Sequence, residues 1–389
     1  MVKPLGRVEI YFKLNRILLS LIGLWPYQTP GERQLAMSVL FFLTISQLIP
    51  QVTGLLKVKD DFDTVIECLP PLGIAGLCMI KVINLTRNND KKDFDIAISG
   101  SSTEEMAIFQ RSGERSTKLS KIYASDIYTI GTLFILPPLL EASSSQIFSA
   151  EINETESPKR LPFVVEYYVD TNDYFYLIIV HSFLSTIAFV TILIGADAMF
   201  TVYLEHVLFS LIYPYRLSQF IEPGKLDVDI NRQEIDDLVY QRAKICVHLH
   251  KEAIEFADAI ESAYSISQLF QVSLCCLLMS ITGLHAATKL NKPDELVRFF
   301  GVIFSLMLQL LFYSWPSHEL MDQSVNVCEA IYNTEWYSVS IRTRKLLLQM
   351  MTRSFQACKI TAGKLYLINS MSYFTMLSSM QEQSTTIVK

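Results

Sequence analysis

Residues 34–56 read QLAMSVLFFLTISQLIPQVTGLL, a stretch without Asp, Glu, Lys or Arg. A helix needs roughly 20 mainly apolar residues to cross about 30 Å of hydrocarbon, and this stretch is long enough. Half of the whole chain is hydrophobic, only 19% is charged and the mean hydropathy is +0.29, unlike an ordinary soluble domain. We therefore predict an all-α, polytopic membrane protein.

The same pattern recurs along the chain and predicts seven transmembrane helices. Three of the segments hold one or two charged residues, and the others hold none. No internal repeat, low-complexity tract or Gly/Ser linker divides the chain, so residues 1–389 are predicted to form one domain. The predicted helices are 34–56, 64–86, 124–146, 174–196, 262–288, 299–317 and 360–380.

Positive charge predicts the orientation, because Lys and Arg concentrate on the cytoplasmic side of a membrane. The N-terminal tail and every second connecting segment carry 22 Lys and Arg residues, against seven in the alternate segments. This places the N-terminus inside and, with seven crossings, the C-terminus outside. Residues 1–33 are expected to be cytoplasmic or interfacial, with Trp25 and Tyr27 at headgroup depth. Asn153 opens a glycosylation acceptor triplet in a loop assigned to the outside.

Two long inner segments have amphipathic periodicity. In 231–264, apolar residues recur at steps of three and four, and 319–355 contains RTRKLLLQMM with a similar pattern. The first segment predicts that the fifth membrane helix extends into the cytoplasm, and together they predict a packed cytoplasmic base. The alternative is that these helices lie on the inner leaflet.

The final predicted helix is rich in hydroxyl groups and ends SMSYFTMLSSM at 370–380. The i, i+4, i+7 spacing places Ser372, Met376 and Ser379 on one face, with Thr375 beside them and Met380 next round. This face is suited to line a pore, which Met side chains would close by dewetting. The alternative is structural, because membrane hydroxyls also bond their own helix and small residues allow close packing.

Several classes of function find no support in the sequence. There is no Gly-x-Ser-x-Gly, phosphate loop, His-Glu-x-x-His or dinucleotide fingerprint, so we expect neither an enzyme nor a cofactor. The seven cysteines show no metal-ligand spacing, and a net charge of −6 argues against nucleic acid as a partner. A secondary transporter would show inverted repeats and interrupted helices in matching positions, and the sequence shows neither.

The chain resembles insect odorant receptors along nearly its whole length. The resemblance rests on YFKLNRILLSLIGLWPYQ near the N-terminus, which is similar to the hymenopteran type, on GADAMFTVYLEHVLFSL after the fourth predicted helix, and on the run from NTEWYSVSIRTRKLLL to the final SSM. The family's co-receptor has a longer second inner loop, so the chain looks like a ligand-tuned subunit. Gustatory receptors carry Gln-Phe where Ser379 and Met380 stand here.

The resemblance implies an odorant-gated, non-selective cation channel that forms a heterotetramer with the co-receptor. Each subunit would contribute its last helix to the pore, in the plasma membrane of olfactory sensory dendrites. A gustatory-type channel subunit and a metabotropic seven-helix chemoreceptor remain alternatives. The predicted N-terminus inside opposes the metabotropic one.

The resemblance also implies a ligand pocket among the outer halves of the second to sixth helices, with walls that are mostly apolar. Every apolar candidate could equally be plain packing. His181 is the ionisable candidate, although a neutral, hydrogen-bonded core histidine is the alternative. Asp197 and Lys364 are interpreted as packing or ion-pair residues. The pocket candidates are Leu72, Gly73, Gly131, Phe134, Ile135, Tyr176, His181, Ser182, Met279, Thr282, Phe300 and Ile303.

Overall fold

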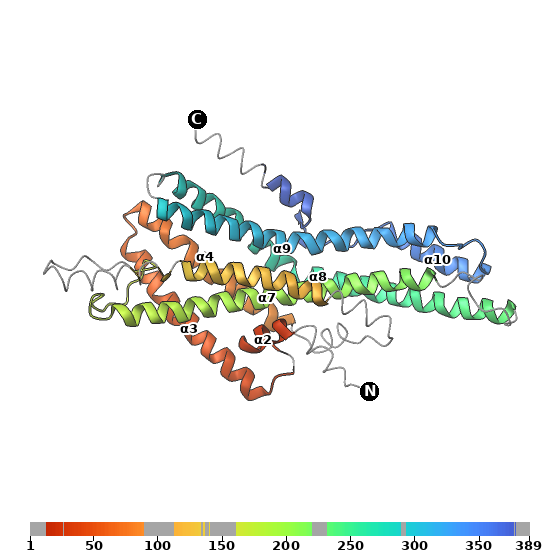
Figure 1. The fold of residues 1–389 in the computed structure, drawn as a ribbon, viewed down its shortest axis with the longest axis horizontal. Helices are drawn as coiled ribbons and strands as arrows, with labels where there is room; N and C mark the ends of the chain where they lie inside the picture. The colour runs from red at the N-terminus through yellow and green to blue at the C-terminus, as the bar shows by residue number, and fades with distance from the viewer. Residues whose placement is uncertain are drawn as a thin grey trace.

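The structure is a computed structural model of an elongated helical bundle (Figure 1). It describes residues 13–25, 27–88, 113–133, 135–136, 140, 161–219, 232–288, 293–376 and 378. The longest helices lie side by side, and α8 and α9 run along much of the long axis. The main helices are α3 (Pro30–Lys57), α4 (Phe62–Asn88), α7 (Phe175–Gln219), α8 (Arg232–Thr288), α9 (Pro293–Tyr332) and α10 (Ile341–Ser354).

Helix α7 is the centre of the bundle. It contacts α3, α4, α8 and α9, and Ile194, Leu204 and Leu211 on it are completely buried. A helix that is apolar on all sides is expected in such a position. Among the described residues, five helices are long and apolar enough to cross a membrane, namely Pro30–Lys57, Thr64–Arg87, Phe175–Ile212, Gln233–Leu284 and Phe299–Tyr332.

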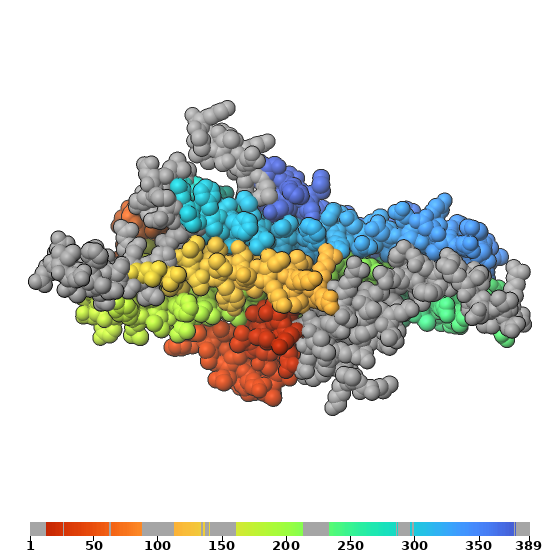
Figure 2. Space-filling view, viewed as in Figure 1, coloured from red at the N-terminus to blue at the C-terminus, as the bar shows by residue number. Residues whose placement is uncertain are grey.

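These five helices coincide in sequence with the first, second, fourth, fifth and sixth predicted spans. The third predicted span overlaps a helix over 113–133, which lies between α9 and the α2–α3 region on the face shown in Figure 2. That helix packs closely on α9, since a Cβ added to Gly301 would be 2.9 Å from Cδ1 of Ile130. The total of seven and the direction of crossing stay predictions.

The N-terminal region packs into the bundle. Helix α2 (Lys13–Leu21) contacts α7, and Leu19 on it is 1% exposed. Trp25 is only 7% exposed and belongs to the main core, so it packs inside the protein, and its place at headgroup depth stays a prediction. The next helix begins at a capping box, in which Thr29 and Glu32 each accept the other's backbone N–H.

At one end of the bundle, α8 and α9 pack with α10 (Figure 1). We call this the α10 end. Leu347 and Met350 of α10 are buried against Val239 and Cys246 of α8. The predicted packing of the RTRKLLLQMM segment against its amphipathic neighbour is therefore confirmed. The two segments form a bundle and do not lie apart on a surface.

The prediction of one continuous helix over 360–380 is wrong. Residues Thr361–Ala362 (β1) and Tyr366–Leu367 (β2) form an antiparallel hairpin, and helix resumes only at residue 370. Gly363 and Lys364 in the turn both have positive φ, which a helix does not allow. The Gly363 N–H donates to the Ser265 carbonyl of α8 at 2.9 Å. The helix then begins at Asn369, whose side chain accepts the Ser372 N–H at 2.7 Å.

Candidate functional site

A cavity of about 160 Å³ lies among α3, α4, the 113–133 helix, α7, α8 and α9. Successive prolines in α4 remove two backbone donors, which opens a helix locally. The walls are mostly apolar and include Pro70, Pro71, Ile74 and Leu77 from α4, Ile127, Ile130 and Gly131 from the 113–133 helix, Phe189, Val190 and Leu193 from α7, Leu278 from α8, and Val302 and Leu306 from α9.

The segment 161–174 borders this cavity, and we call it the lid. Phe163 of the lid lines the cavity. The Glu166 N–H donates to the carbonyl of Pro50 at 2.9 Å, and the Thr53 hydroxyl donates to the Glu166 carbonyl at 2.8 Å. Gly54 allows this close approach, because an added Cβ would lie 2.8 Å from the Val164 carbonyl oxygen. The lid is therefore fastened to α3 through backbone contacts.

An ion pair also holds the lid. The Glu166 carboxylate accepts from the Lys57 ammonium group and from the Tyr168 N–H, the latter at 2.9 Å. The Lys57 hydrogen bond, followed by the Tyr168 one, lowers the pKa of Glu166 below its ordinary value. Glu166 therefore stays charged at neutral pH.

Five polar side chains reach the cavity wall. Gln47 and Gln51 come from α3, Thr186 comes from α7, and Ser305 and Gln309 come from α9. The Ser305 hydroxyl donates to the Asp126 carboxylate at 2.5 Å, and the Gln309 amide nitrogen lies 3.5 Å from Oδ2 of Asp197. The cavity is thus an apolar chamber with a few polar groups, which is typical of a small-molecule site.

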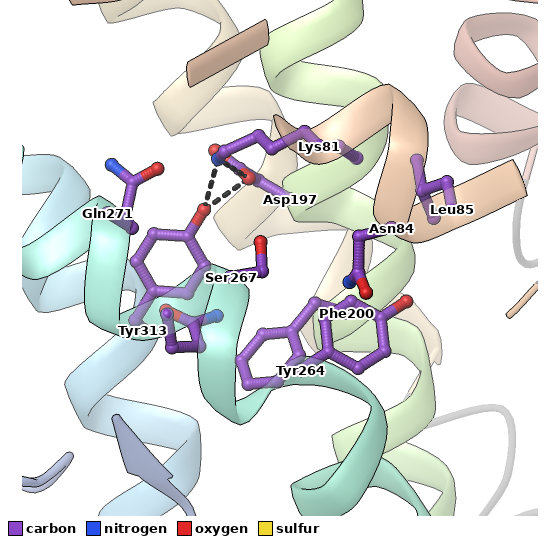
Figure 3. A pocket seen from close by; sticks show the side chains of 11 residues that line it. Lys81, Asn84, Leu85, Asp197, Phe200, Tyr264, Ser267, Gln271 and Tyr313 are labelled. Atoms are coloured by element: carbon purple, nitrogen blue, oxygen red, sulfur yellow. Dashed lines mark hydrogen bonds and ion pairs between the residues drawn. The ribbon is translucent and has the colours of Figure 1, made fainter. Parts of the chain in front are cut away.

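A buried charged cluster lies next to the cavity and meets it at Gln309. Lys81 of α4 donates to the Asp197 carboxylate of α7 and, at 2.6 Å, to the Tyr313 hydroxyl of α9. Figure 3 shows these three side chains pointing toward one another. Tyr123 donates to Oδ2 of Asp197 at 2.7 Å. The interpretation of Asp197 as an ion-pair residue is confirmed, whereas Lys364 lies in the hairpin turn.

Of the predicted pocket residues, Gly131 lines the cavity and the other described candidates do not. Met279 and Ile135 are buried in packing clusters, and Tyr176 and Phe300 are exposed on the bundle surface. Phe134, Asn153, Ser379 and Met380 lie outside the described residues. The remaining candidates away from the cavity are Leu72, Gly73, His181, Ser182, Thr282 and Ile303.

His181 is hydrogen-bonded on both ring nitrogens. Nε2 lies 2.8 Å from the Ser46 hydroxyl, and Nδ1 lies 2.7 Å from the Tyr167 hydroxyl. Tyr167 in turn donates to Oε1 of Gln47 at 3.0 Å. His181 is therefore connected to the cavity wall only through Tyr167 and Gln47. This agrees with the alternative interpretation of His181 as a hydrogen-bonded core histidine.

The final helix presents its hydroxyl groups unevenly. Tyr373 is buried against α8 and α9, and Met376 is half-buried with its sulfur 3.0 Å from that of Cys276. Ser372 is half-buried, whereas Thr375 and Ser378 are exposed. The Thr375 hydroxyl donates to its own helix at the Met371 carbonyl, at 2.9 Å. Among the predicted pore residues, Thr375 is therefore the one that the described chain leaves most accessible.

Metal chemistry finds no site in the part of the chain that the structure describes. No group of three or more His, Cys, Asp or Glu side chains there could hold an ion. All seven cysteines are described, and all are free thiols.

A family model described as 7tm Odorant receptor matches residues 61–380 of this chain. Odorant receptor Or2 of Anopheles gambiae is 27% identical over 156 residues, which are 36% of this chain and 39% of that protein. Odorant receptor 10 of Aedes albopictus is 25% identical over 190 residues, 45% of this chain and 48% of the relative. The alignments thus span less than half of each of these relatives.

Solved structures show the same fold over almost the full chain. The olfactory receptor OR5 from Machilis hrabei in complex with eugenol superimposes with a TM-score of 0.81, at 15% identity over 98% of both chains. The structure of the same receptor described without eugenol gives a TM-score of 0.76 at 14% identity, again over 98% of both chains.

Proposed function

The chain belongs to the 7tm odorant receptor family of insects, and on this premise we propose that it is the ligand-binding subunit of an odorant-gated, non-selective cation channel. Its family and its apolar helices make it a membrane protein and not an enzyme. The observation that carries the proposal is the cavity of about 160 Å³ beside the lid, whose walls are apolar apart from five polar side chains. Such walls suit a volatile molecule, because burial of apolar surface supplies its affinity.

The proposed partners follow from the family. The chain acts in a heterotetramer with the family's co-receptor, in the plasma membrane of olfactory dendrites. Seven crossings with the N-terminus inside would bring the lid to the outer surface and the α10 end to the cytoplasm. The positive-charge distribution supports this orientation.

We assign the pore to the last helix. Ser372, Thr375 and Met376 are its described pore candidates, and Ser379 and Met380 follow them in the sequence. Thr375 is exposed on this chain, which leaves it accessible to an ion path or to a neighbouring subunit. Hydroxyl and thioether rings around a central axis would let hydrated cations pass when open and exclude water when closed.

The experiment that tests this function is electrical. Co-expression with the co-receptor in cells without G-protein signalling should give cation current on exposure to an active volatile. A response that needs G-protein signalling would favour the metabotropic alternative.

A further inference from the structure

Two glutamines on one helix face meet the cavity. Gln47 and Gln51 are four residues apart on α3, so they lie on successive turns of the same side. They are 1% and 5% exposed, although the helix carries many exposed apolar residues on its other faces. Both line the cavity. Burying two amides in a membrane helix is unfavourable unless their polar atoms find partners.

Each glutamine has one polar atom without a partner. Oε1 of Gln47 accepts from Tyr167, which leaves Nε2 as a buried donor with no hydrogen-bond partner among the described residues. Oε1 of Gln51 is a buried acceptor that likewise has no hydrogen-bond partner among the described residues. Two side chains that line the cavity from neighbouring turns of α3 therefore hold one unpaired hydrogen-bond donor and one unpaired acceptor.

We propose that this cavity selects small apolar molecules that carry a hydroxyl group, alcohols or phenols. The ligand oxygen accepts from Nε2 of Gln47, and the ligand hydrogen is donated to Oε1 of Gln51. This inference rests on the proposed function, since it names the ligand class of the same site. A hydroxyl is the smallest group that donates and accepts through one atom, so it satisfies both amides.

Other ligand classes satisfy the two amides less well. A ketone or an ether only accepts, so it leaves Oε1 of Gln51 unpaired, and a hydrocarbon leaves both atoms unpaired. A site whose buried polar groups lose their partner discriminates strongly against the analogue. Tyr167 is hydrogen-bonded to the Gln47 amide and to His181. These two contacts hold the Gln47 amide in place and so orient its Nε2 donor.

The volume sets the size of the ligand. A dry apolar cavity of about 150 Å³ holds a molecule such as benzene. The cavity of about 160 Å³ therefore suits roughly one six-membered ring or a chain of similar bulk.

The test uses the full-length protein, purified in nanodiscs, and measures thermal stabilisation by cyclohexanol, cyclohexanone and methylcyclohexane. These probes share one ring and differ in the polar group. Cyclohexanol should act at a concentration about ten-fold lower than cyclohexanone, because one hydrogen bond is lost in the ketone, and lower again than methylcyclohexane.

Two variants separate ligand recognition from folding. Gln51→Leu should abolish the preference for cyclohexanol over cyclohexanone and should raise the melting temperature of the unliganded protein, because it removes a buried acceptor without a partner. Gln268→Leu is the matched control. Gln268 is also buried with an unpartnered Oε1, but it does not line this cavity, so its change should leave the preference intact.

Three results would overturn the inference. These are equal stabilisation by methylcyclohexane and cyclohexanol, no stabilisation by any of the three probes, or a lower melting temperature for unliganded Gln51→Leu. The proposed function fails separately. If alcohols bind the purified protein but no compound evokes a current in cells, the channel function is refuted and the ligand class stands. If only compounds without a hydroxyl evoke a current, the ligand class is refuted and the channel function stands.

Discussion

Lys81 of α4 and Asp197 of α7 form an ion pair inside the bundle, where they are 5% and 2% exposed. The same carboxylate accepts from Tyr123 and Tyr313, so it joins four helical segments. It also meets the ligand cavity through Gln309. A buried pair of this kind depends on both partners, because either charge left alone would be strongly unfavourable.

Removal of one charge should therefore destabilise the protein more than removal of both. We expect Lys81→Met and Asp197→Asn each to lower the free energy of unfolding by about 3–5 kcal/mol, and the double variant to lose much less than their sum. Thermal unfolding of the purified variants gives the coupling energy. Additive losses would show that the pair is not coupled.

The lid should depend on the missing side chain of Gly54. In Gly54→Ala the new Cβ would lie 2.8 Å from the Val164 carbonyl oxygen, so the lid must move away from α3. We expect a several-fold weaker ligand response and faster hydrogen exchange in 161–174. Gly76→Ala in α4 is the control, because its Cβ meets nothing within 4 Å and alanine favours the helix by about 1 kcal/mol. Equal behaviour of the two variants would contradict the close contact.

The lid ion pair should make a small, pH-dependent contribution to stability. Because the folded-state pKa of Glu166 lies below its ordinary value of 4.5, the contribution is fully present above about pH 4.5. It is lost as the pH falls through the lower, folded-state pKa. The Lys57 side chain is 69% exposed, so Glu166→Gln should cost less than about 1 kcal/mol at pH 7. A difference in melting temperature between the two proteins that does not shrink as the pH falls below 4.5 would be the contrary result.

The assignment of the last helix to the pore is tested with introduced cysteines. Thr375→Cys and Met376→Cys should make the evoked current sensitive to a water-soluble thiol reagent, because a pore wall is wet when the channel is open. Tyr373→Cys is the control, because Tyr373 is only 8% exposed and packs on α8 and α9. The unmodified chain with its seven native cysteines sets the background. Full, unblocked current in both Thr375→Cys and Met376→Cys after treatment with the reagent would contradict the assignment of the last helix to the pore.

Hydropathy and amphipathic spacing predicted the five long apolar helices and the packing of α10, because these depend on the total apolar length and on the period of a helix. The hairpin at 361–367 escaped prediction. Its strands have two residues each, and contacts with α8 stabilise them. Gly363 and Asn369 were the available signals for a turn and a new helix start.

The pocket was predicted less well, since composition does not tell which way an apolar helix is rotated. In α4 the cavity is lined by Ile74 and Leu77, whereas Leu72 and Gly73 were the expected residues. Helix α7 is apolar all round, so its sequence marks no pocket face. One signal was available in α3, where Gln47 and Gln51 follow each other at helical spacing within residues 34–56, which hold no charged residue.

The most direct test of the central claim is the current carried by this chain together with the co-receptor, in cells that lack G-protein signalling, on exposure to a panel of volatile compounds. We predict that at least one volatile in the panel evokes a cation current that needs no second messenger. Gln51→Leu should change which volatiles evoke this current. The account would be contradicted if correctly inserted protein gave no current with any compound and if the cells responded only when G-protein signalling was present.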